Sequence, residues 1–180
     1  MSRLRFRRRL GTFIAASALL LTAGCKYGFS GGGGFPSDIR TIYIEPFENQ
    51  TAQFELDQML FRQLTEKLPR ALGARPGGEA NADAVVRGKI TRYDNAGQNY
   101  RPGQTTASNT NTSIDVLTYQ VTITVAIELI DRKRNVVLWE SQALVGRGDW
   151  RAKDQQETNG RDIALNHLLQ QIIDGAQSQW

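Results

Sequence analysis

The chain has 180 residues, of which 22 are lysine or arginine and 18 are aspartate or glutamate, giving a formal net charge of +4. Five of the arginines lie within the first nine residues, and the rest of the chain has 17 basic and 18 acidic residues. This balance of charge gives no reason to expect a nucleic-acid partner. The single cysteine excludes an intramolecular disulfide framework, and the length suits one domain with its own core.

The N-terminus has the pattern of an export signal. The arginines precede an apolar stretch over residues 11–21, which ends in Thr22, Ala23 and Gly24. A stretch of this length is too short to span the roughly 30 Å hydrocarbon core of a bilayer as a permanent helix. We therefore expect residues 1–24 to be a signal peptide that is removed.

The only cysteine, Cys25, follows this signal directly. Small residues before a cysteine resemble the lipobox of bacterial lipoproteins, in which the cysteine sulfur is acylated; Thr22 departs from the leucine that is commonest at that position. The alternative is an ordinary soluble-export signal with an incidental cysteine. On the first interpretation, residues 25–37 form a lipidated, glycine-rich flexible linker, and the acyl chains attach the protein to a membrane.

The next segments predict a strand and then a helix. The β-branched run from Ile39 stops at Pro46, as expected of a short strand. Residues 52–69 have helical periodicity, and Pro69 with Gly73 is expected to end the helix. Its predicted apolar face comprises Phe54, Leu60, Phe61, Leu64 and Leu68.

Three further strands and a second helix follow. Residues 82–94 alternate as a half-buried strand, residues 94–113 are polar and predict a functional or disordered loop, and residues 117–129 alternate most regularly. A charged turn with Arg132, Lys133 and Arg134, which we expect to be solvated, leads into a returning strand and completes a β-hairpin. Residues 160–180 predict an amphipathic helix.

The element order β-α-β-β-β-α predicts an α+β fold. Two helices packed on one face of a four-stranded mixed sheet would bury all the apolar stripes in a two-layer sandwich. We expect this domain to cover residues 38–180.

Residues with catalytic potential are sparse. His167, the only histidine, is expected on the solvated side of the last helix, so we predict no metal site, no cofactor and no enzymatic activity. Asn49-Gln50-Thr51 matches a glycosylation sequon, which we do not expect to be used.

The segments taken together resemble the LPS-assembly lipoprotein family LptE. The similarity rests on the order and spacing of CKYGF at residues 25–29, TIYIEPFENQT, DAVVRGKITRY, TYQVTITVAIEL and VVLWESQALVGRGDW. The resemblance implies an outer-membrane lipoprotein on the periplasmic face that plugs and stabilises the β-barrel of LptD and contacts lipopolysaccharide. Lys26, after the cysteine, is compatible with sorting to the outer membrane.

The resemblance also suggests contact residues. Arg101 lies in a YRPGQT stretch similar to the family's aromatic-Arg-x-Gly-Gln-Thr motif, and Lys153 resembles a second basic position, so both are candidates for contact with lipopolysaccharide. Solvated loop charges are the alternative. Trp150 is a candidate partner-interface residue, whereas Tyr119 and Trp139 fit inward positions.

A second hypothesis remains open. The opening IYIEPFENQT also resembles lipoproteins that regulate a peptidoglycan synthase or form a secretion assembly, and a shared fold does not decide between these roles.

Overall fold

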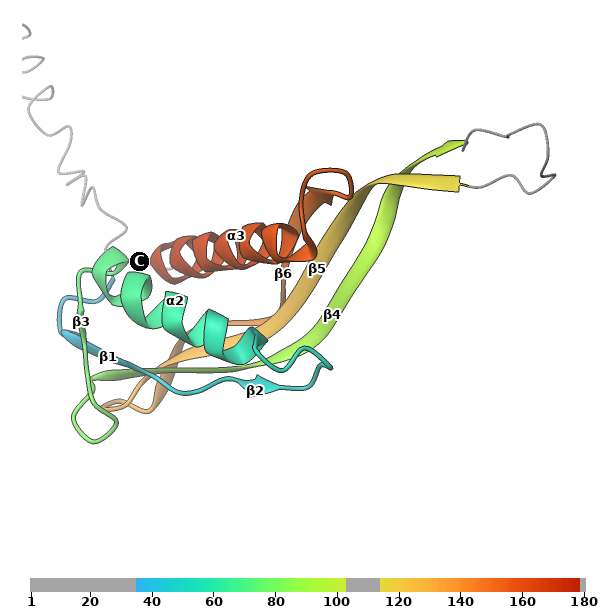
Figure 1. The fold of residues 1–180 in the computed structure, drawn as a ribbon. Helices are drawn as coiled ribbons and strands as arrows, with labels where there is room; N and C mark the ends of the chain where they lie inside the picture. The colour runs from blue at the N-terminus through green and yellow to red at the C-terminus, as the bar shows by residue number, and fades with distance from the viewer. Residues whose placement is uncertain (1–34, 103–113, 179–180) are drawn as a thin grey trace, which may run out of the picture. The chain divides into compact units, whose positions relative to one another are not determined.

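The computed structural model describes residues 35–102 and 114–178. In chain order its elements are β1 (Thr41–Ile44), β2 (Glu48–Asn49), α2 (Leu56–Ala71), β3 (Arg75–Pro76), β4 (Ala84–Pro102), β5 (Ile114–Asp131), β6 (Val136–Arg151) and α3 (Glu157–Gln177). The predicted α+β arrangement is confirmed, because α2 and α3 pack on a mixed open sheet (Figure 1).

The sheet combines a parallel and an antiparallel part. Its strand order is β3-β1-β4-β5-β6, and β2 also pairs with β4. The pairs β1–β3, β1–β4 and β2–β4 are parallel, whereas β4, β5 and β6 form successive antiparallel pairs. The four expected strands are therefore present. Strands β2 and β3, of two residues each, were not predicted from the sequence pattern.

The core lies between the helices and one face of the sheet. The strict alternation in β5 sends its apolar side chains to this face, where Val121, Ile123 and Val125 are fully buried. From the helices the matching buried leucines are Leu56, Leu60, Leu64 and Leu68 of α2 and Leu165 and Leu168 of α3.

Glycines bring α3 unusually close to β6. A Cβ added to Gly148 would collide with the carbonyl oxygen of Gly160, and one added to Gly146 would collide with the carbonyl oxygen of Ala164. Only residues without a side chain allow the helix backbone and the strand backbone to approach this closely. This contact aligns the start of α3 along the second half of β6.

Side chains near and within α3 also cover part of the free edge of β6. Gln171 Nε2 donates to the Val145 carbonyl at 3.0 Å, and His167 Nδ1 accepts the Arg147 N–H at 3.4 Å. Gln155 Oε1 accepts the Arg151 N–H at 2.7 Å. These contacts supply partners to edge groups that no neighbouring strand reaches.

Helix α2 differs from its predicted bounds at both ends. It begins at Leu56, so Phe54 lies outside it and is 87 % exposed instead of on the apolar face. It also continues through Pro69 to Ala71, because a proline in the last turn removes only one backbone hydrogen bond. Gly73, with φ of 71°, follows the end of the helix.

The predicted loop over residues 94–113 is wrong for its first part. Strand β4 continues to Pro102 and pairs with β5 as far as Ile114. Beyond β1 and β2 the sheet continues as β4, β5 and β6, and β4 and β5 extend together past the end of β6 (Figure 1). We call residues 91–102 and 114–124 the finger.

Candidate functional site

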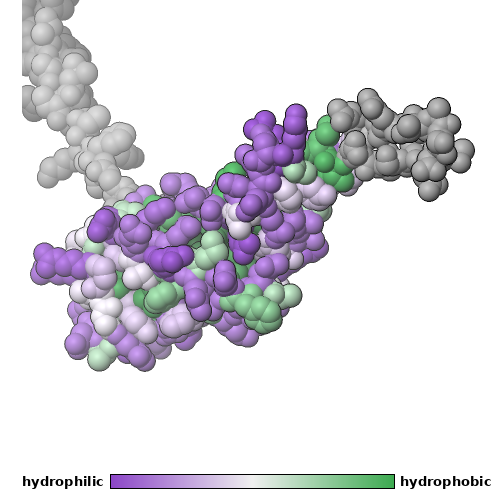
Figure 2. Space-filling model, in the orientation of Figure 1, coloured by the Kyte–Doolittle hydropathy of each residue, from purple (hydrophilic) through white to green (hydrophobic). Residues whose placement is uncertain are grey.

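The end of the finger contains one of the two predicted lipopolysaccharide-contact residues. Arg101 lies on β4, in register with Asp115 of β5. Figure 2 shows apolar surface near this end, where Leu117 is 42 % exposed and Tyr100 is 59 % exposed. The finger thus presents apolar and aromatic side chains to solvent close to the backbone position of Arg101.

Lys153 lies at the same end of the sheet. Asn99, Thr118 and Arg151 form one row across β4, β5 and β6, and Lys153 follows Arg151 by two residues in the exposed turn before α3. Arg101 lies two residues beyond Asn99 on β4. The fold therefore brings two segments that are far apart in sequence to one end of the domain.

Trp150, the candidate interface residue, is part of β6. Its indole ring is half-buried and stacks on the ring of Tyr119, with centroids 4.6 Å apart. The indole Nε1–H donates to Asn95 Oδ1 at 3.1 Å. Trp139 packs against the core as expected, and a Cβ on Gly175 of α3 would collide with its ring.

Polar side chains connect the base of the finger to the start of α3. Asn95 Nδ2 donates to Glu157 Oε2 at 2.9 Å, and the Tyr93 hydroxyl donates to Glu157 Oε1. Burial, together with this bond to Glu157, raises the pKa of the Tyr93 hydroxyl above its usual range. Glu157 lies in the first turn of α3, where the helix dipole favours a negative charge.

The opposite end of the sheet contains a group of ion pairs that we call the clasp: Asp83, Asp131, Lys133 and Arg134. Lys133 Nζ lies 2.6 Å from Asp83 Oδ1, and Arg134 Nε lies 2.5 Å from Asp131 Oδ2. Arg134 also pairs with Asp38 at 3.0 Å. We expected this turn to be simply solvated; its basic side chains are exposed, but Lys133 and Arg134 are ion-paired and Arg132 donates to the Glu79 carbonyl oxygen.

The clasp also binds the backbone where the domain begins. Asp83 Oδ2 accepts hydrogen bonds from the backbone N–H groups of Arg40 and Thr41 and from the Thr41 hydroxyl at 2.8 Å. The bonds from Lys133 and Thr41 hold the pKa of Asp83 well below its usual range. The first residues of the domain are therefore fixed at the end of the sheet away from the finger.

In Asp131 burial opposes ionisation, but hydrogen bonds from Arg134 and Lys133 outweigh it. They include a bond from the Lys133 N–H at 2.8 Å, and together they lower the pKa of Asp131. The side chain is only 2 % exposed. A charged and buried Asp131 thus organises the turn between β5 and β6.

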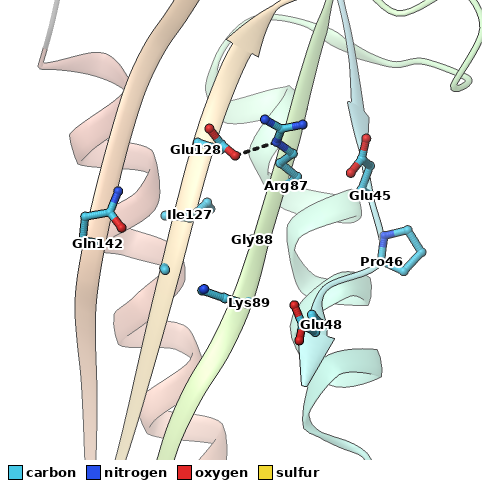
Figure 3. Close-up of a pocket in the computed structure, with 10 residues that line it drawn as sticks. Glu45, Pro46, Glu48, Arg87, Gly88, Lys89, Ile127, Glu128 and Gln142 are labelled. Atoms are coloured by element: carbon cyan, nitrogen blue, oxygen red, sulfur yellow. Dashed lines mark hydrogen bonds and ion pairs between the residues drawn. The ribbon is translucent and has the colours of Figure 1, made fainter. Parts of the chain in front are cut away.

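The face of the sheet away from the helices carries a shallow depression of about 440 Å³ (Figure 3). Its lining includes Glu45, Glu48 and Glu128, with Arg87 and Lys89 between them. Arg87 Nε lies 2.5 Å from Glu128 Oε1, and this ion pair raises the pKa of Arg87. Charges of both signs on an open surface give the depression no strong preference for anions or cations.

Two further observations concern metal ligands and membrane-spanning helices in the described residues. In residues 35–102 and 114–178, no group of three or more His, Cys, Asp or Glu side chains could hold a metal ion. No helix in the same ranges is long and apolar enough to cross a membrane. Cys25, the expected acylation site, lies outside the described residues.

Comparison with known proteins gives one family match. The model of the family described as "LptE: Lipopolysaccharide-assembly" matches residues 39–176, which include all six strands, α2 and all but the last residue of α3. No curated protein matches the chain in a sequence search.

Solved structures with a similar arrangement have low sequence identity. The PelC dodecamer from Paraburkholderia phytofirmans is 12 % identical, with 82 % of this chain and 94 % of that chain covered and a TM-score of 0.46. The lipoprotein GNA1162 from Neisseria meningitidis is 14 % identical, with coverages of 75 % and 96 % and a TM-score of 0.44. The uncharacterized lipoprotein B from Nitrosomonas europaea is 18 % identical, with coverages of 83 % and 88 % and a TM-score of 0.42.

Proposed function

The chain belongs to the LptE lipopolysaccharide-assembly family, a family of non-catalytic assembly lipoproteins, and from this membership we propose that it plugs and stabilises the LptD β-barrel. In this role it is an outer-membrane lipoprotein on the periplasmic face, attached through acyl chains on Cys25. It contacts lipopolysaccharide during assembly in the outer leaflet. The observation that carries the proposal is the family match over residues 39–176.

The length of the domain supports the plug. The 19 residues of β4, at about 3.3 Å each, give a strand up to about 60 Å long. A bilayer with its headgroups is about 40–45 Å thick. The clasp fixes the first residues of the domain at the start of β4, and the finger lies at its other end. A domain attached near one leaflet is thus long enough to reach the other inside a barrel.

The charges at the finger end support a contact with lipopolysaccharide. Lipid A phosphates are anions, which Arg binds with paired N–H donors and Lys binds as a point charge. Lys153 is exposed there, and Arg101 lies on the adjacent strand end. The apolar surface near the end of the finger suits the acyl chains of the same molecule (Figure 2). Trp150, half-buried beside the finger, is our proposed contact with the barrel.

The first experiment identifies the partner. The full-length acylated protein is affinity-purified from its own outer membrane in mild detergent, and the proteins that come with it are identified. We expect a near-stoichiometric LptD barrel. A peptidoglycan synthase or a ring made of this chain alone would contradict the proposal and favour the second hypothesis.

A second experiment tests the contact residues. Arg101→Ala combined with Lys153→Ala is expected to weaken lipopolysaccharide binding about tenfold, which corresponds to about 1.4 kcal/mol. The matched control, Arg62→Ala with Lys67→Ala, removes the same two charges from the exposed side of α2. Equal binding by the two folded double variants would remove Arg101 and Lys153 from the site.

A further inference from the structure

We propose that the loop between β2 and α2 is a second docking surface, on which Phe54 inserts into an apolar pocket of a partner protein bordered by lysine or arginine. This surface lies apart from the proposed lipopolysaccharide contact and has the opposite charge. The proposal holds whether or not the LptD assignment is correct.

Phe54 is the most exposed of the large apolar side chains in the described residues. It is 87 % exposed, compared with 59 % for Tyr100 and 48 % for Ile163. Figure 2 shows apolar surface over this loop beside a mainly hydrophilic body. Burying a phenylalanine ring removes a large apolar surface from water, and exposed aromatic side chains of this kind are typical anchors of protein interfaces.

The loop holds the ring on a rigid support. Asn49 Oδ1 accepts the Thr51 N–H at 3.0 Å and the Thr51 hydroxyl at 2.8 Å, while Asn49 Nδ2 donates to the Gln53 carbonyl at 2.7 Å. The Thr51 hydroxyl oxygen in turn accepts the Gln53 N–H at 3.2 Å. The sequon motif of Asn49 and Thr51 thus has a local structural role.

Both ends of the loop are also attached to the core. The Gln50 N–H donates to the Ile90 carbonyl of β4 at 2.9 Å, and the Leu56 N–H donates to the Gln53 carbonyl at 3.3 Å. Leu56 itself is fully buried. Because little freedom is lost when Phe54 binds, the loop is suited to recognition with a small entropic cost.

The charge around Phe54 identifies the kind of partner. The loop and the first turns of α2, residues 49–61, contain two acidic residues, Glu55 and Asp57, and no lysine, arginine or histidine. Phosphate-bearing lipids would be repelled by this segment, whereas basic side chains around an apolar pocket would pair with it. The occupant that fits is therefore a protein surface with that composition.

The test uses site-specific photo-cross-linking in the full-length acylated protein in its own outer membrane. Benzoylphenylalanine replaces Phe54 in one variant and Ile163, on the exposed side of α3, in the control. We expect one protein cross-linked at position 54, through a peptide with at least two basic residues beside apolar ones, and no such product at position 163. A cross-link to lipid, to lipopolysaccharide or to a second copy of this chain, or no product at position 54, would overturn the proposal.

Quantitative binding to the identified partner completes the test. Phe54→Ala is expected to weaken binding at least tenfold, and Glu55→Lys to weaken it and reduce its sensitivity to salt, while Phe54→Leu retains most of the affinity. Unaltered binding by folded Phe54→Ala would contradict the anchor role. Because Phe54 is so exposed, the same variant is expected to unfold at the wild-type temperature.

Discussion

The indole ring of Trp150 stacks on the ring of Tyr119 with the two planes only 13° from parallel. Such aromatic pairs contribute about 0.5–1.5 kcal/mol beyond the area they bury. The bond from the Trp150 indole to Asn95 holds the pair against β4. The pair therefore fixes the end of β6 against the finger, next to the turn that contains Lys153.

Asn95 is expected to contribute to this arrangement because it bonds both Trp150 and Glu157. Asn95→Ala leaves both groups without that partner, and we expect a loss of about 1–3 kcal/mol in the free energy of unfolding, measured with urea. Asn99→Ala, at an exposed position of the same strand, is the control and should change stability by less than about 0.5 kcal/mol. Similar losses in the two variants would contradict the role of Asn95.

The close approach of α3 to β6 predicts a strong effect at Gly148. Gly148→Ala places a methyl group against the carbonyl oxygen of Gly160, and such overpacking costs about 1–3 kcal/mol. Thermal unfolding should show a clearly lower midpoint. Gly78→Ala is the control, because nothing lies within 4 Å of its added Cβ, and it should unfold like the wild type.

The clasp predicts a defined dependence of stability on pH. The pKa of Asp83 is lower in the folded than in the unfolded protein, so its contribution is present above the unfolded value of about 3.9 and is lost as pH falls below it. Asp83→Asn should therefore lower stability at pH 7 and flatten its decline below about pH 4. Asp162→Asn, on the exposed surface of α3, should leave that acid decline unchanged.

The corrected start of α2 predicts opposite results for two apolar residues of one segment. Leu60→Ala creates a cavity at a fully buried position and should cost about 2–5 kcal/mol of unfolding free energy. Phe54→Ala should change that free energy by less than about 0.5 kcal/mol. A large loss of stability for Phe54→Ala would mean that the ring belongs to the core after all.

The periodicity of apolar residues was sufficient to predict secondary structure where burial alone determines it. The alternation in β5 predicted Val121, Ile123 and Val125 as inward residues, although Leu117 on the same predicted face is exposed. The helical period predicted Leu60, Leu64 and Leu68 as core residues of α2. The helical period wrongly placed Phe54 on the apolar face of α2, because this residue has an apolar side chain at the right spacing but precedes the helix. A local periodicity does not show where the Asn49-centred turn ends and the helix begins.

The second half of β4 was not predictable for a different reason. Its inward positions Tyr93 and Asn95 are polar, and they are satisfied by Glu157, which lies 62 residues beyond Asn95 in the chain. The extension of β6 to Arg151 likewise depends on Gly146 and Gly148 meeting α3. Both features depend on contacts between distant segments, which no window of sequence contains. The clasp is of the same kind, because Asp83 and Lys133 come from different strand ends.

The partial cover of the β6 edge has a consequence for self-association. An uncovered strand edge is a template on which identical chains add to one another and aggregate. Gln155, His167 and Gln171 occupy backbone groups along the second half of β6, so a second molecule would have to displace them before it could pair there. Helix α3, which completes the core, and the turn before it thus hinder separate molecules from polymerising along this part of β6.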